Sequence, residues 1–94
     1  MTITYSPEAI DDLVDVATFA ARDNPAAATK LADRVMDMID QLARGGLDGP
    51  EHELVSGGRV RSWPVPPLRI YYRREADDLQ IVRIYHQARR PIVR

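Results

Sequence analysis

The chain has 94 residues, which suits a single domain with one hydrophobic core. It contains no cysteine, which excludes disulfides and thiolate chemistry and fits the reducing cytoplasm, where we expect the protein to reside. The net charge of −1 conceals a split: residues 1–58 carry four basic and eleven acidic residues, and residues 59–94 carry nine arginines and three acids. This asymmetry indicates either a basic surface with an anionic partner, or helices and strands that neutralise each other.

The first half of the chain predicts a short strand and two helices. Residues 2–5 are mostly β-branched or aromatic, which is typical of a strand. Ser6 can cap a helix that begins at Pro7, and Asn24 can cap a second helix that begins at Pro25 and ends at Gly45-Gly46. So short a connection makes the two helices an antiparallel hairpin. Their apolar stripes consist of Ile10, Leu13, Val14, Ala17 and Ala20 or Ala21, and of Ala28, Leu31, Ala32, Val35, Met38 or Ile39, and Leu42.

The second half predicts a loop and three antiparallel strands. Residues 47–58 contain three of the five glycines and a proline, so we expect a loop in which His52 is solvated. Residues 59–65 form a strand that ends at Pro66-Pro67. Residues 68–74 and 79–86 alternate with a period of two, and the polar residues 75–78 suit a tight turn between them.

The predicted fold class is therefore α+β, with a helical hairpin packed on a small antiparallel sheet in the order β-α-α-β-β-β. We expect one domain that spans residues 1–94. The core should contain Leu13, Val14, Leu31, Val35, Leu42, Ile70, Tyr72, Val82 and Ile84.

Arginine and tyrosine side chains share one face of the predicted hairpin. This basic face consists of Arg69, Tyr71, Arg73, Arg83 and Tyr85, with Arg61 and Trp63 from the neighbouring strand. Like charges on adjacent strands repel each other, so we expect an anionic neighbour, although a solvated sheet face is the other interpretation. His86, at the end of the last strand, could serve as a general acid or base, or could cap nearby backbone.

Common catalytic and cofactor signatures are absent from the sequence. The paired glycines at 45–46 and 57–58 lack the lysine and hydroxyl residue of a phosphate-binding loop. The two histidines are far apart in the chain and no cysteine accompanies them, which makes a poor set of metal ligands. We therefore expect neither a cofactor nor a metal.

The chain resembles the RelE/ParE superfamily of bacterial toxins, and its ParE branch most closely. The resemblance extends over nearly the whole chain and is carried by short segments: YSPEA at residues 5–9, DNPAAA at 23–28, GRVR at 58–61, LRIYYR at 68–73 and IYHQARRP at 84–91. The fold of that superfamily is a helical hairpin on a small antiparallel sheet. It agrees with the fold that the sequence periodicities predict independently.

The resemblance implies a toxin that inhibits growth or stabilises plasmids and is neutralised by a ParD-like antitoxin encoded beside it. ParE-like members inhibit DNA gyrase by binding, whereas RelE-like members cleave mRNA on the ribosome. The absence of lysine from residues 47–58 and the slightly negative net charge favour the ParE-like function, which is not enzymatic. In the nuclease alternative, Arg61 and His86 would be catalytic. The residues expected to contact an antitoxin or target are Arg61, Trp63, Arg69, Tyr71, Arg73, Arg83, Tyr85, Arg89 and Arg90.

The expected antitoxin has an acidic C-terminal segment that is disordered alone and folds on binding. Its carboxylates should face Arg69, Arg73 and Arg83, and its aliphatic side chains should enter a groove near Trp63 and Tyr85. The resemblance implies a heterotetramer or larger complex that reaches operator DNA only through the antitoxin. We expect no membrane partner.

Overall fold

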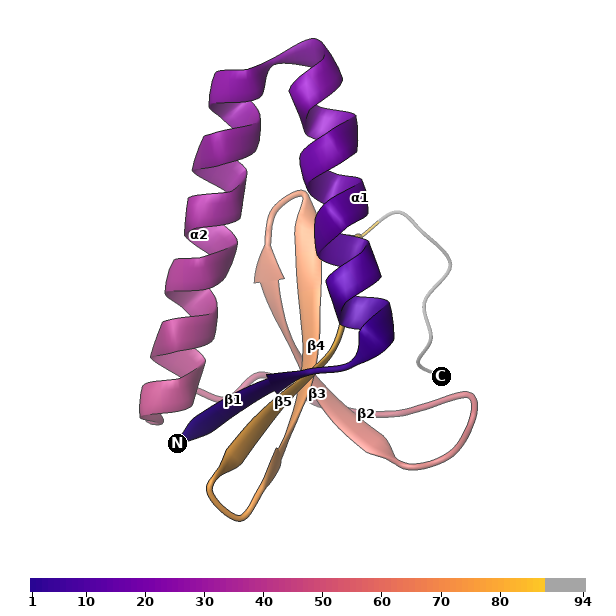
Figure 1. Ribbon diagram of the computed structural model, residues 1–94. Coiled ribbons are helices and arrows are strands. Elements are labelled where there is room, and N and C mark those ends of the chain that lie inside the picture. The colour runs from indigo at the N-terminus through magenta and orange to yellow at the C-terminus, as the bar shows by residue number, and fades with distance from the viewer. Residues whose placement is uncertain (88–94) are drawn as a thin grey trace.

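The computed structural model describes residues 1–87, apart from the side chains of residues 19–21 and 23. Two helices stand side by side as a hairpin over one face of a twisted sheet (Figure 1). The elements in chain order are β1 (Thr2–Tyr5), α1 (Pro7–Asp23), α2 (Pro25–Arg44), β2 (Glu51–Glu53), β3 (Arg59–Val65), β4 (Leu68–Glu75) and β5 (Asp78–His86). The predicted α+β fold and the order of its elements are confirmed, with one strand added.

The five strands form one sheet in the order β1-β5-β4-β3-β2. Neighbouring strands are antiparallel except β1 and β5, which run parallel and lie far apart in the chain, as parallel neighbours must. The added strand is β2, which lies within the predicted loop of residues 47–58. It forms because His52 pairs with Val60 across a turn that contains Gly57 and Gly58, both with positive φ.

The beginning of α1 covers the edge of β5 where β1 ends. Ser6 caps the helix as predicted, because its Oγ accepts a hydrogen bond from the Ala9 amide at 3.0 Å. The same hydroxyl donates to the carbonyl of Val82, and the Ser6 amide donates to the carbonyl of Ile81. Asn24 caps α2 as predicted by accepting from the Ala27 amide at 3.1 Å. Local sequence signals thus fix both helix starts, and the first cap also fixes α1 to the sheet.

The main core lies between the helices and the sheet, and most of the predicted core residues belong to it. Val35, Leu42, Ile70, Tyr72 and Ile84 are buried there, and Leu13 and Leu31 pack against it half-buried. Two predictions were wrong, for Val14 and Val82, which lie outside this core.

Val82 faces away from the main core because β5 contains a bulge. Tyr71 pairs with Arg83 but Tyr72 pairs with Ile81, so Val82 has no partner residue in β4. The bulge puts both Ile81 and Ile84 on the core face, where strict alternation would place only one of them.

Val14 is exposed because α1 is rotated from the predicted orientation. Its buried side carries Ala9, Leu13 and Val16, whereas Ile10 and Val14 are 52% and 58% exposed. Both stripes have helical spacing, so periodicity alone does not choose between them. The anchoring of the first turn to β5 selects the Ala9 side.

Neither helix, within the described residues, has the length and apolarity that a membrane span requires.

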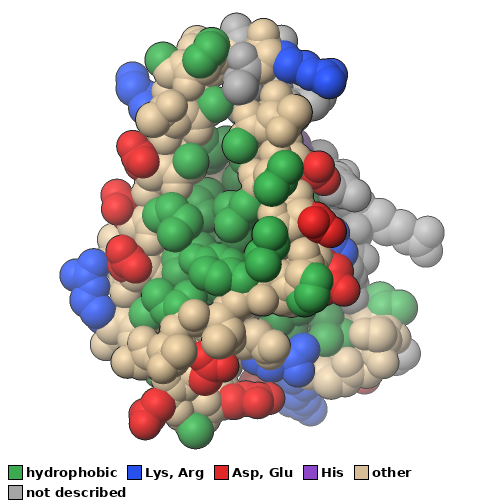
Figure 2. All heavy atoms as spheres, viewed as in Figure 1, with side chains coloured by type: hydrophobic (Ala, Val, Ile, Leu, Met, Phe, Trp, Pro, Cys, Tyr) green, Lys and Arg blue, Asp and Glu red, His purple; other side chains and the backbone are tan. Residues whose placement is uncertain are grey.

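The space between the helices is lined by apolar side chains, and acidic side chains lie along the outer flanks of both helices (Figure 2). Most of the acidic half of the chain is therefore on the helical side of the molecule. The sheet strands β3, β4 and β5 carry the arginines of the basic half that the structure describes.

Candidate functional site

The predicted basic face is divided between the two faces of the sheet. Arg69, Tyr71 and Tyr85 lie on the face opposite the helices, as expected. Arg61 and Trp63 do not, because they pair with Tyr72 and Ile70 and share their helix-covered face. Their placement on the basic face was wrong by one residue of register. Trp63 and Tyr85 are therefore on opposite faces, and a single groove cannot contain both.

A small second core occupies the face opposite the helices. It contains Leu54, Val60, Tyr71 and Tyr85, all buried, and Val82 packs against it. The rings of Tyr71 and Tyr85 stack with centroids 5.4 Å apart. Burial, and then the neighbouring Tyr85, raise the pKa of Tyr71 above its usual value. This face is thus partly apolar and its two tyrosines are fixed.

Three polar side chains adjoin this second core and bind one another. The Oγ of Ser62 lies 2.8 Å from Nε2 of His52 and accepts a hydrogen bond of 2.8 Å from Nη1 of Arg69. Ser62 is completely buried, so its hydroxyl is not an accessible nucleophile. His52 is half-buried on a strand, and its assignment to a solvated loop was wrong. The hydrogen bond to Ser62 holds the side chain of Arg69 across β3.

Arg83 binds α1 within the chain. Its Nε and Nη2 donate to the two carboxylate oxygens of Asp12 at 2.7 and 3.0 Å, a forked arrangement. Asp12 also accepts from the backbone amide of Ile84 at 2.9 Å and is only 5% exposed. Hydrogen bonding to Asp12 raises the pKa of the Arg83 guanidinium. This pair joins helix to sheet and is the neutralisation that the charge split had suggested.

Asp12 is a key residue that the sequence reasoning missed. A usable signal was present, because Asp12 lies three residues after Ala9 and four before Val16, on the side of α1 that is buried. A carboxylate in a buried stripe requires a cationic or amide partner.

The segment that links α2 to β2 crosses the end of the sheet. Gly49 donates its amide to the hydroxyl of Tyr72 at 2.9 Å, and its carbonyl accepts from Nη1 of Arg61 at 2.9 Å. A Cβ at Gly49 would lie 1.6 Å from the carbonyl oxygen of Ser62, so only glycine fits this approach. Burial raises the pKa of Tyr72, whose hydroxyl also contacts Asp48.

Arg74 fixes the same segment from β4. Its Nε donates to Asp48 at 2.9 Å, its Nη2 donates to the carbonyl of Leu47 at 3.0 Å, and its guanidinium lies 5.5 Å from the centre of the Tyr72 ring. Partial burial alone would raise the pKa of Asp48, but the hydrogen bond and charge of Arg74 outweigh it and lower that pKa.

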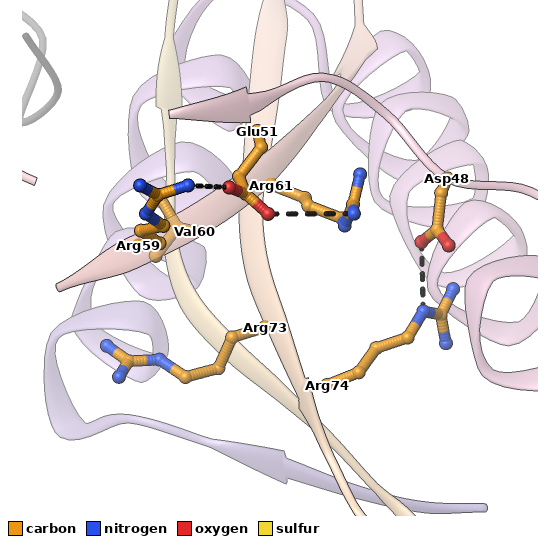
Figure 3. Close-up of a pocket in the computed structure, with 7 residues that line it drawn as sticks. All are labelled: Asp48, Glu51, Arg59, Val60, Arg61, Arg73 and Arg74. Atoms are coloured by element: carbon orange, nitrogen blue, oxygen red, sulfur yellow. Dashed lines mark hydrogen bonds and ion pairs between the residues drawn. The ribbon is translucent and has the colours of Figure 1, made fainter. Parts of the chain in front are cut away.

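An open pocket of about 390 Å³ lies where β3 separates from β4. It is lined by Asp48, Glu51, Arg59, Val60, Arg61, Arg73 and Arg74. Figure 3 shows Arg73 and Arg74 leaving β4 in opposite directions, with Arg74 directed to Asp48. Glu51 pairs with Arg59 and, at 3.6 Å, with Arg61. The Nε of Arg73 is buried and has no hydrogen-bond partner among the described residues.

Most arginines of β3, β4 and β5 have partners within the chain, so they do not form a row without internal partners. Arg61, Arg69, Arg74 and Arg83 all bind groups of this chain, and Arg73 alone has a buried nitrogen left unpaired within residues 1–87. His86 is exposed at the end of β5. Arg89 and Arg90 lie outside the described residues. No group of His, Asp and Glu side chains within residues 1–87 is arranged to hold a metal ion.

A helical hairpin over one face of a five-stranded sheet, with arginines and tyrosines along the sheet, places the chain in the class of RelE/ParE-like α+β folds. The chain belongs to the ParE toxin family, since the model of the ParE toxin of the type II toxin–antitoxin system parDE matches residues 3–91. The chain is also similar to a solved structure described as the chromosomal ParDE TA system from P. aeruginosa. The TM-score is 0.71 at 22% identity, over 92% of this chain and 95% of that chain. No curated protein sequence matches the chain.

Proposed function

We propose that this ParE-family chain inhibits DNA gyrase by binding it and is neutralised by a ParD-like antitoxin. The match to the ParE toxin family over residues 3–91 carries the proposal. The likeness to a ParDE structure agrees with an antitoxin partner. Gyrase inhibition and an antitoxin are the properties that the family resemblance implies.

The internal bonds of three sheet arginines support binding rather than cleavage. Arg61 is tied to Gly49 and Glu51, Arg69 to Ser62, and Arg83 to Asp12. A nuclease needs such groups directed at the scissile phosphate, whereas here they hold the fold. The net charge of −1 also gives no general attraction to RNA.

Controlled expression in bacteria tests the target. We expect growth arrest with DNA breaks and an SOS response while transcripts remain intact, and inhibition of supercoiling by purified gyrase. Cleaved, translated mRNA with undamaged DNA would instead establish the ribosome-dependent nuclease. Unimpaired growth at high levels of folded protein would contradict both functions.

Co-expression with the antitoxin encoded beside the toxin tests the partner. We expect growth to recover and the two chains to copurify in a stable heterotetramer or larger complex. Recovery should require the C-terminal segment of the antitoxin, since that is the part expected to fold on the toxin. A full-length antitoxin that is soluble but neither binds nor restores growth would contradict the pairing.

A further inference from the structure

We propose that the pocket between β3 and β4 binds a glutamate or aspartate side chain of an extended peptide segment, with Arg73 as the main contact. This deepens the proposed toxin–antitoxin pairing and rests on it only for the identity of the partner.

The pocket exists because two paired strands diverge. The register between β3 and β4 ends at Arg61 and Tyr72, although β3 begins two residues earlier at Arg59 and β4 continues to Glu75. Within the described residues, this part of β4 has no strand beside it on that side. An unpaired strand edge presents backbone donors and acceptors to an incoming extended segment.

The charges in the pocket leave room for an anion. Four arginines line it, against the two carboxylates of Asp48 and Glu51. Asp48 is held by Arg74, and Glu51 is shared by Arg59 and Arg61. Arg73 therefore has no carboxylate among the residues that line the pocket. A buried guanidinium nitrogen without a hydrogen bond is costly, and an oxyanion would relieve that cost.

A carboxylate fits these groups better than a phosphate chain does. The pocket already contains three arginine–carboxylate contacts, so its geometry suits that kind of pair. A nucleic acid would bring many charges toward a chain whose net charge is −1, and the acidic helices would repel it. A planar carboxylate can accept two parallel hydrogen bonds from the guanidinium of one arginine.

A titration followed by NMR tests the pocket without any antitoxin. The probe is the peptide acetyl-Val-Glu-Val-Glu-Val-amide, and the signal is the Nε–Hε resonance of Arg73. We expect a saturable shift with this peptide and none with its Gln counterpart. Inorganic phosphate and a short oligothymidylate, at equal ionic strength, should bind more weakly than the acidic peptide.

Two variants that keep the charge make the test specific. Arg73→Lys retains a cation but loses the fork, and we expect at least a fivefold loss of affinity for the acidic peptide. Arg34→Lys, at an exposed position of α2, is the matched control and should change affinity less than twofold. Amide spectra verify that both variants fold.

Several results would overturn the proposal. They are the absence of saturable binding in wild type, equal binding of the Gln peptide, unchanged affinity in Arg73→Lys, or tighter binding of the oligothymidylate. Copurification with the antitoxin is measured separately. A chain that binds the acidic peptide but no antitoxin would contradict the proposed pairing and leave the pocket established.

Discussion

Arg83 and Arg73 occupy similar positions in the strand pattern of the sequence, but they differ in whether the folded chain supplies a partner for the guanidinium. Both lie on central strands of the sheet and both were expected to face an anionic partner. Arg83 has its fork on Asp12, which is 5% exposed, and its own guanidinium stacks 5.1 Å from the centre of the Tyr85 ring. Arg73 has a buried nitrogen with no bond within the described chain. One arginine joins helix to sheet, and the other is available at an open pocket.

This difference shows why a row of arginines is poor evidence for a binding face. A cation that the fold already neutralises adds little to a partner's affinity, because a partner must compete with the internal acid. The arginine whose bonds are incomplete is the better candidate. The following variants test the contrast, in order of decreasing effect on stability.

The largest effect should come from Asp12→Ala. It removes three hydrogen bonds and leaves Arg83 and the Ile84 amide without their acceptor. Breaking such a pair lowers the free energy of unfolding by about 3–5 kcal/mol. Urea denaturation measures the change, with the exposed Asp11→Ala as the matched control. Equal stability of the two variants would mean that the Asp12 contacts do not hold α1 to the sheet.

The sequence predicted those features that depend on neighbouring residues. Ser6 and Asn24 cap their helices, and Leu68, Ile70 and Tyr72 lie on the core face, because capping and alternation are local properties. The same local rules failed at Val82, where a bulge interrupts the alternation.

Long-range packing decided the features that the sequence did not predict. Whether α1 buries Leu13 with Ala9 or with Val14 depends on how its first turn binds β5. The hydrophobic periodicity of α1 contains no information about that contact. The short strand β2 forms only because β3 is beside it. The paired functions of Asp12 and Arg83 connect residues 71 positions apart in the chain. In α1, however, the position of Asp12 within the buried stripe was a signal that could have been used.

Gly49→Ala should have the next largest effect, on the side of the open pocket. The new Cβ would collide with the Ser62 carbonyl, so the segment next to Asp48 must move away from β3. We expect the free energy of unfolding to fall by about 3 kcal/mol, as it does when extra atoms are forced into a tightly packed site. Thermal or urea unfolding measures it. The other four glycines all have positive φ, which alanine would strain, so Gly49→Ala is compared directly with wild type. Near-wild-type stability of Gly49→Ala would show that this contact is looser than the structure indicates.

The two arginines themselves should respond differently when each is replaced by methionine. Arg83→Met leaves the buried Asp12 without its cation and should lower stability by about 2–3 kcal/mol. Arg73→Met removes a buried donor that has no partner, so stability should stay the same or rise by about 1 kcal/mol. Methionine keeps an unbranched stem in both variants, which makes them a matched pair. Equal losses in urea denaturation would remove the distinction between the two arginines.

The smallest effect concerns Asp48, the exposed counterpart of Asp12. The Arg74 contact lowers the pKa of Asp48 below its ordinary value of 3.8 in the folded chain, so the unfolded chain takes up a proton first as the pH falls. The ion pair therefore stabilises the fold above about pH 4, and this contribution is lost as the pH falls through the folded pKa.

Asp48→Asn removes this dependence on pH. Because Asp48 is 47% exposed on its side chain, the difference should be less than about 1 kcal/mol. Urea midpoints at pH 7, 4 and 2.5 measure it, with the exposed Asp37→Asn as the control. We expect the stability of Asp48→Asn to approach that of wild type as the pH falls, while the Asp37→Asn curve stays parallel to wild type. If Asp48→Asn also stays parallel, Arg74 holds the linking segment through the Leu47 carbonyl alone, and the acidic wall of the pocket contributes nothing to stability.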